Sequence, residues 1–102
     1  MDPEGLSTIG ISDVVKSTAG RDQNELFYVI DADELYVTLA NGKDRPLDRP
    51  KRKKRKHVQK VLRSETRVAA KLMQGDKVLN SELRRNLAIV GQAMQSNNLG
   101  GF

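Results

Sequence analysis

The stretch LFYVIDADELYVTLANGK, residues 26–43, holds the strongest structural signal in this 102-residue chain. Its segments 26–31 and 34–40 are rich in Tyr, Phe, Val, Ile and Thr, which suit the pleated surface of a β-sheet. Every second residue from Leu35 to Leu39 is apolar, so the second segment should have one buried face and one wetter face. The two segments therefore predict a pair of adjacent strands joined by a tight acidic turn.

Further strands are expected on both sides of this pair. Residues 13–18 predict one strand, and residues 43–47 predict a short one that two nearby prolines confine to a sheet edge. Asn41-Gly42 predicts a type I′ hairpin turn, because both residues tolerate a positive φ. A last strand should follow Pro50, with Val58 as its inward residue. Short strands with no helix between them indicate a small antiparallel barrel.

The hydrophobic period changes to a helical one after residue 60. Residues 64–74 predict a short helix with Ser64 as the N-cap type and Gly75 just past its end. A second helix should be capped by Asn80 or Ser81. Its apolar residues recur at helical spacing: Leu83, Leu87, Val90 and Met94. The predicted fold is mainly β with a helical extension: a flexible N-terminus at 1–8, a barrel at 9–60, two short helices within 61–95, and a flexible tail at 96–102.

Positive charge is concentrated in the second half of the chain. Residues 1–50 hold five Lys/Arg and ten Asp/Glu, whereas residues 51–102 hold thirteen and three, within a net charge of +5. The run RPKRKKRKHVQK at 49–60 has six adjacent basic residues from Lys51 to Lys56. Such a run favours a polyanionic partner, since each phosphate contact releases a condensed counterion. A solvated charge run and a nuclear-import signal have the same composition and remain alternatives.

Composition argues against several other classes of protein. The chain has no cysteine and one histidine, so disulfides, thiolate zinc sites and a histidine metal cluster are not expected. The acidic turn at Asp31–Glu34 lacks the pattern of a calcium loop. No phosphate-binding loop or nucleophile motif is present. We therefore expect a cytoplasmic monomer that is not an enzyme and that has no cofactor, small-molecule substrate or membrane partner.

Four stretches of the chain resemble the KOW-type RNA-binding domain. They are VVKSTAGRD (14–22), FYVID (27–31), LYVTLANGK (35–43) and RPKRKKRKHVQ (49–59). The resemblance is to a bacterial stand-alone KOW group, similar to the large-subunit ribosomal protein family numbered fourteen in archaea and eukaryotes. It extends more weakly to residues 69–87. It implies an SH3-like barrel whose first loop and basic strand face ribosomal RNA.

The predicted RNA interface combines this first loop with the basic run. Gly20 permits a tight turn, Arg21 offers a planar fork for phosphate or a guanine edge, and Asp22 could hold Arg21 in place. The family usually has a glycine where Asn24 stands, and asparagine enters the left-handed region at modest cost. The predicted contacts are Lys16, Ser17, Gly20, Arg21, Asp22, Lys43, Arg45, Arg49, Lys51, Arg52, Lys53, Lys54, Arg55, Lys56, His57, Lys60, Arg84 and Arg85.

We thus predict a ribosome-associated module that binds structured RNA by shape and phosphate charge. Few aromatic residues are available, which argues against a stacking platform for single strands. The competing prediction is an SH3-like protein-interaction module of a transcription or translation complex. Within the first prediction, the chain is either a permanent ribosomal protein or a transient factor.

Overall fold

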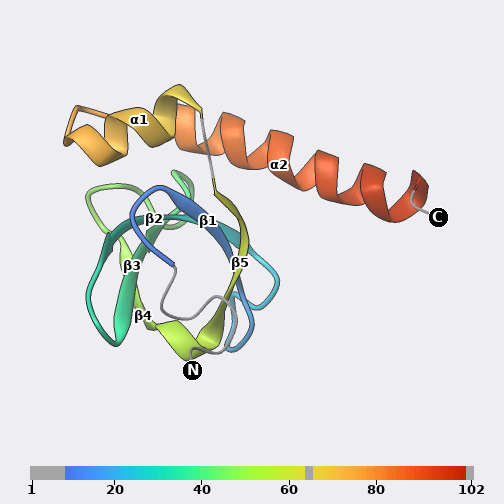
Figure 1. Ribbon diagram of the computed structural model, residues 1–102, viewed down its shortest axis with the longest axis horizontal. Helices are drawn as coiled ribbons and strands as arrows, with labels where there is room; N and C mark the ends of the chain where they lie inside the picture. The colour runs from blue at the N-terminus through green and yellow to red at the C-terminus, as the bar shows by residue number, and fades with distance from the viewer. Residues whose placement is uncertain (1–8, 64–65, 101–102) are drawn as a thin grey trace.

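A curved five-stranded antiparallel sheet and two helices make up the protein (Figure 1). The computed structural model describes residues 9–63 and 66–100, the side chains of 96–100 excepted. The predicted flexible N-terminus at 1–8 lies outside the described residues, as do Ser64 and residues 101–102. The elements are β1 (Asp13–Ser17), β2 (Leu26–Ala32), β3 (Tyr36–Ala40), β4 (Lys51–Lys54), the 3₁₀-helix η1 (Arg55–His57), β5 (Val58–Arg63), α1 (Arg67–Gln74) and α2 (Asn80–Gly100).

The sheet order is β4-β3-β2-β1-β5, which places the two strands from the basic segment at opposite edges. Register shifts between Val14 and Val15 in β1, and between Val29 and Asp31 in β2, interrupt the ladders. Such irregularities increase local twist and bend. The sheet curls until η1 connects its two edges at the bottom of Figure 1. A mainly β fold is therefore confirmed, while closure into a barrel stays a prediction.

The central strands bury side chains on both faces of the sheet. On the inner face, Val15 and Phe27 pack in a cluster with residues of β3 and β5. On the outer face, Val14 and Tyr28 pack in a second cluster against α1 and α2. Figure 1 shows both helices on the side of the sheet opposite η1. Because adjacent residues of each strand are both buried, β1 and β2 lack the apolar–polar alternation of strands with one solvated face.

The outer cluster joins the helices to the sheet. Leu83 and Leu87 of α2 are buried there, and Val90 packs against the cluster as a partly buried residue. The burial of Leu83, Leu87 and Val90 therefore agrees with the apolar face predicted for the second helix. Met94 is half-buried and lies outside the described cluster. The helix continues through Gly100. The flexible tail expected at 96–102 stays a prediction.

The segment after β3 is a loop and not the predicted hairpin. Asn41 keeps a negative φ, and residues 43–47 form no strand. Instead, Asn41 Oδ1 accepts hydrogen bonds from the backbone N–H groups of Lys43 and Arg45, at 2.9 and 3.0 Å. These N–H groups are therefore bonded to the Asn41 side chain and not to a neighbouring strand, and residues 41–50 form a local loop. Leu35, predicted to face inward, precedes β3 and is 66% exposed.

Helix ends differ in part from the predicted caps. Thr66, rather than Ser64, is the N-cap of α1, and Gly75 ends that helix in the left-handed region as predicted. At the start of α2, Glu82 accepts a hydrogen bond from the Leu79 N–H at 2.9 Å. Asn80 Oδ1 instead accepts from the Leu47 N–H at 2.8 Å, so this side chain ties α2 to the 41–50 loop.

Neither helix in the described part of the chain has the length and hydrophobicity needed to cross a lipid bilayer.

Gly42 and Gly75 provide a matched pair for testing how closely α2 approaches the 41–50 loop. Both have φ +76°, but a Cβ on Gly42 would lie 2.2 Å from the Asn80 carbonyl oxygen, whereas a Cβ on Gly75 meets nothing within 4 Å. We expect Gly75→Ala to cost about 1 kcal/mol of unfolding free energy, the ordinary cost of a side chain at positive φ. Gly42→Ala should cost about 3 kcal/mol because backbone must also move.

Urea unfolding followed by circular dichroism measures both values. Equal losses in the two variants would show that the contact between Gly42 and Asn80 is not tight in solution.

Candidate nucleic-acid interface

The basic strand β4 presents its residues alternately to the interior and to solvent. Lys53 pairs with the inward-facing Val37 of β3 and is itself only 8% exposed. Lys51 is half-buried, whereas Arg52 and Lys54 are exposed. Because side chains along a strand alternate between faces, four consecutive basic residues are divided into an inner and an outer pair.

The inner pair converges on one carboxylate. Lys51 Nζ lies 2.8 Å from Asp22 Oδ2, and Lys53 Nζ lies 2.7 Å from Asp22 Oδ1. The Ser17 hydroxyl donates to Asp22 Oδ1 at 2.7 Å. Lys53 also donates to the Ala19 carbonyl at 2.7 Å. This group, which we call the Asp22 cluster (Ser17, Asp22, Lys51 and Lys53), joins edge strand β4 to the loop between β1 and β2.

The local fold of that loop, residues 18–25, brings Asp22 into position. Gly20 has φ +89° and Asn24 has φ +75°. The Asn24 N–H donates to the Ser17 carbonyl at 2.7 Å, which closes the loop over the end of β1. The predicted left-handed conformation of Asn24 is thereby confirmed. Two positive-φ residues thus turn the chain tightly enough for the Asp22 carboxylate to point toward β4.

Electrostatics keep this carboxylate ionised. Burial raises the pKa of Asp22, but hydrogen bonds from Lys51, Lys53 and Ser17 lower it by more, so its pKa lies well below its usual range. Charge-assisted hydrogen bonds to an ionised group are the strong ones, and here they offset the cost of desolvation. The cluster therefore carries one negative and two positive charges at neutral pH.

Three predicted RNA contacts have protein partners in this cluster. Ser17, Asp22 and Lys53 are each at most 8% exposed. The expected pairing of Asp22 with Arg21 is replaced by its pairing with the two lysines, because β4 delivers their ammonium groups to the inner side of the loop. These three side chains position the surrounding strands and do not form an accessible surface.

The outer face of the basic segment is anchored to the β2–β3 turn. The Arg52 guanidinium lies 3.8 Å from the centre of the Tyr36 ring and 2.9 Å from Asp33 Oδ2. The hydrogen bond from Arg52, together with those from the Tyr36 and Leu35 backbone, lowers the pKa of Asp33. Arg55 donates to the Asp33 and Ile9 carbonyl oxygens, at 2.8 and 2.7 Å. Part of the basic run is therefore committed to structure on this face too.

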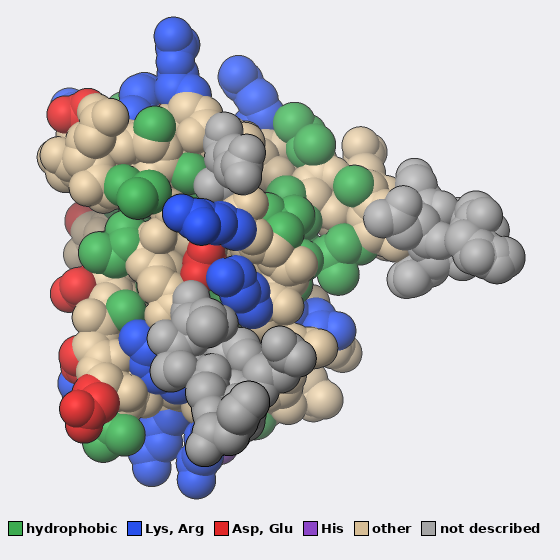
Figure 2. All heavy atoms as spheres, viewed as in Figure 1, with side chains coloured by type: hydrophobic (Ala, Val, Ile, Leu, Met, Phe, Trp, Pro, Cys, Tyr) green, Lys and Arg blue, Asp and Glu red, His purple; other side chains and the backbone are tan. Residues whose placement is uncertain are grey.

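Other cations of the segment face solvent. Lys54, Lys56 and Arg63 are exposed, and the part of the chain that the structure describes offers them no ion-pair partner. Lys60 is half-buried, 3.5 Å from Asp13 Oδ2. His57 is half-buried, and its carbonyl accepts from the Thr18 N–H. Figure 2 shows Lys and Arg side chains at the lower end of the molecule, over the connection between β4 and β5.

A second group of predicted contacts meets where the 18–25 and 41–50 loops adjoin. A hollow of about 290 Å³ is lined by Arg21, Asp22, Glu25, Phe27, Asp44, Arg45 and Lys51. Beside it, Glu25 also lines a groove with Lys43 and with Arg84 of α2. Arg21 and Lys43 are exposed, and Arg84 donates to the Gly42 carbonyl. Acidic and basic side chains are mixed here, so this region differs electrostatically from the outer basic segment.

The remaining predicted contacts are dispersed. Lys16 is half-buried on β1, Arg49 is exposed near the end of the 41–50 loop, and Arg85 is exposed on α2. Sequence reasoning missed Glu25 and Asn41. The tendency of asparagine to bond nearby backbone could have identified Asn41 as a loop organiser, whereas no local signal places Glu25 opposite α2.

Across residues 9–63 and 66–95, no three His, Asp or Glu side chains are grouped so as to hold a metal ion. No known family model matches the chain, and no curated protein matches it. The family resemblance of the sequence stays a prediction.

The Asp22 cluster predicts a specific pH dependence of stability. Asp22→Asn should cost about 3 kcal/mol of unfolding free energy at pH 7, because it leaves Lys53 buried without its counter-charge. A carboxyl whose pKa is depressed by folding stabilises the protein above its unfolded pKa, about 3.9, and the contribution is lost as pH falls toward the folded value. The difference between wild type and Asp22→Asn should therefore shrink below about pH 4.

Urea unfolding at several pH values from 7 to 2 measures this difference. Asp33→Asn serves as the control, since Asp33 also has a lowered pKa but pairs with Arg52 at the surface. It should lose much less stability at pH 7. A difference between wild type and Asp22→Asn that stays constant down to pH 2 would contradict the assigned charge state.

Proposed function

We propose that the protein is an RNA-binding module whose curved sheet is of the SH3-like KOW type. The observation that supports RNA binding most directly is the charge balance of residues 51–63. Four of the eight Lys/Arg side chains in this segment form ion pairs with described residues, and these pairs use only three carboxylates: Asp13, Asp22 and Asp33. A clear excess of positive charge is left on two strands and their connection. Nucleic-acid phosphates are the partners that such an excess favours.

Some basic residues of this segment hold the fold together and others are exposed. This division favours a folded RNA target over an arbitrary polyanion. Lys51, Arg52 and Lys53 hold β4 to neighbouring loops, so the exposed Lys54 and Lys56 are carried on rigid backbone. Fixed cations match a fixed arrangement of phosphates at a lower entropic cost than cations on a flexible tail. Double-stranded and folded RNA is recognised largely through backbone geometry of this kind. The proposed target is therefore folded RNA.

We further propose ribosomal RNA of the large subunit as the target, in the cytoplasm. This step rests on the resemblance of residues 14–22, 27–31, 35–43 and 49–59 to the KOW-type domain. The acidic β2–β3 turn at Asp31–Glu34 adjoins the basic segment, and Arg52 pairs with Asp33 there.

The exposed lysines provide the first test of RNA binding. Each phosphate contact contributes about 0.7–0.9 to the slope of log affinity against log salt concentration, so Lys54→Gln/Lys56→Gln should reduce its magnitude by about 1.5. Stability should be nearly unchanged, because both side chains are exposed. Fluorescence anisotropy with a labelled, folded ribosomal RNA fragment at several salt concentrations measures the slope.

The matched control is Arg67→Gln/Lys77→Gln, which removes two exposed charges from the helical side of the molecule. This variant should keep the wild-type slope. If both double variants flatten the slope equally, only net charge matters and the proposed surface is wrong. If neither does and RNA is not bound, the alternative of a protein-interaction module is favoured.

Sedimentation tests the ribosomal target. The full chain should co-sediment with large ribosomal subunits at near-physiological salt in the presence of excess bulk tRNA. Lys54→Gln/Lys56→Gln should sediment with them to a lesser extent. Specific docking would be refuted if tRNA removed the wild-type protein from the subunits as completely as it removed a polylysine control. Stoichiometric recovery after a high-salt wash would mark a permanent component, and salt-labile recovery a transient factor.

A further inference from the structure

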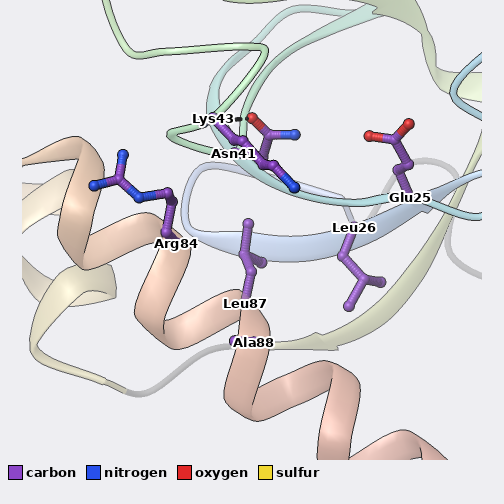
Figure 3. A pocket seen from close by; sticks show the side chains of 7 residues that line it. All are labelled: Glu25, Leu26, Asn41, Lys43, Arg84, Leu87 and Ala88. Carbon is purple, nitrogen blue, oxygen red and sulfur yellow. Dashed lines mark hydrogen bonds between the residues drawn. The ribbon is translucent and has the colours of Figure 1, made fainter.

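The groove between α2 and the loop end of the sheet has two chemically different ends. It has a volume of about 450 Å³ and is lined by Glu25, Leu26, Asn41, Lys43, Arg84, Leu87 and Ala88. Figure 3 shows Glu25 at one side and Arg84 at the other, with Leu87 between them. An apolar floor with a few polar groups at its rim is the usual constitution of a small-ligand site, and this volume lies in the usual range.

The cationic end is pre-oriented by the fold. Arg84 donates one guanidinium N–H to the Gly42 carbonyl, which leaves others of its five donors available. The Lys43 backbone N–H is held by Asn41 Oδ1 at 2.9 Å, so the exposed Lys43 side chain starts from a fixed position. An anionic group such as a phosphate would meet two cations there at little cost in ordering. Asn41 itself is occupied by the loop and does not recognise a ligand.

The opposite end carries an unpaired carboxylate. Glu25 is exposed, and the described residues provide no hydrogen-bond or ion-pair partner for its side chain. An ionised carboxylate offers two acceptor oxygens and no donor. Among the four RNA bases, only guanine presents two adjacent donors on its Watson–Crick edge, the N1–H and the N2 amino group. The other bases present at most one donor beside an acceptor.

We propose that this groove binds an unstacked guanosine nucleotide of the RNA. The base lies on Leu26, Leu87 and Ala88, its N1–H and N2 amino group donate to Glu25, and its phosphate lies near Lys43 and Arg84. The inference deepens the proposed function and rests on it for the source of the nucleotide. It adds one sequence-specific contact to binding that is otherwise governed by phosphate charge, since unstacked bases are what proteins read in RNA.

The effect of Glu25→Gln separates base recognition from simple electrostatics. Removal of a negative charge should tighten the binding of any anion if charge alone matters. If Glu25 accepts from guanine, Glu25→Gln should instead weaken guanosine monophosphate binding about tenfold, the usual worth of a hydrogen bond to a charged group. Wild type should bind adenosine monophosphate more weakly than guanosine monophosphate, and Glu25→Gln should not lower the affinity for adenosine monophosphate further.

The measurement is a titration of the ¹⁵N-labelled full chain with guanosine monophosphate, adenosine monophosphate and inorganic phosphate, followed by amide chemical shifts. Guanosine monophosphate should shift the amides of Glu25, Leu26, Lys43 and Ala88. Glu34→Gln, which removes an exposed carboxylate from the β2–β3 turn, is the matched control and should leave the affinity for guanosine monophosphate unchanged. Lys43→Gln should weaken both nucleotides alike.

Three results would overturn the guanine site: equal affinities for the two nucleotides, tighter guanosine monophosphate binding in Glu25→Gln, or shifts confined to other surfaces. If these occur while folded RNA binds with the expected salt slope, the guanine site fails and the RNA proposal stands. If guanosine monophosphate binds in the groove but folded RNA is not bound, the RNA proposal fails and the nucleotide site stands.

Discussion

The contact between Asp22 and the ammonium groups of Lys51 and Lys53 links the parts of this fold that carry its charge. It lies at the inner side of edge strand β4, which has a single neighbour in the sheet and depends on side chains for further attachment. One carboxylate serving two lysines remains ionised because hydrogen bonds outweigh its desolvation. The burial of Lys53 is acceptable only with this partner, since an unpaired buried charge costs several kcal/mol. The position of the 18–25 loop and that of the basic strand are therefore coupled.

This coupling changes the meaning of the polybasic run. In a flexible tail, all six residues from Lys51 to Lys56 would be equivalent counterions for a polyanion. In a strand, every second side chain turns inward, so Lys51 and Lys53 stabilise the protein while Arg52 and Lys54 face outward. Lys56 is exposed on η1. The exposed charges are fewer than the sequence suggests, but they are held on ordered backbone. Under the proposed function, such a surface suits a partner whose anionic groups are fixed in space.

The second organising contact is between α2 and the loop that follows β3. Gly42 lies against the Asn80 backbone, Asn80 accepts from the Leu47 N–H, and Arg84 donates to the Gly42 carbonyl. These contacts, together with the burial of Leu83 and Leu87, fix the helix over the outer face of the sheet. The groove beside them exists because helix and loop come together there. Its residues belong to the 18–25 loop, β2, the 41–50 loop and α2, which are far apart in the sequence.

Local patterns predicted most of the elements. Runs rich in β-branched and aromatic residues identified β1, β2 and β3, Val58 was correctly placed inward, and helical spacing identified α1 and most of α2. Patterns failed at Asn41-Gly42, where the asparagine side chain accepts hydrogen bonds from nearby backbone N–H groups and the hairpin does not form. For the candidate site, composition identified the basic run and the Gly20–Asp22 loop. It could not distinguish Lys53 from Lys54, since both are lysines in an unbroken basic stretch and only strand register assigns one to the interior. Composition also could not predict that Asp22 pairs with β4 or that Glu25 lies across a groove from Arg84. These arrangements depend on sheet order and helix packing between residues that are far apart in the chain.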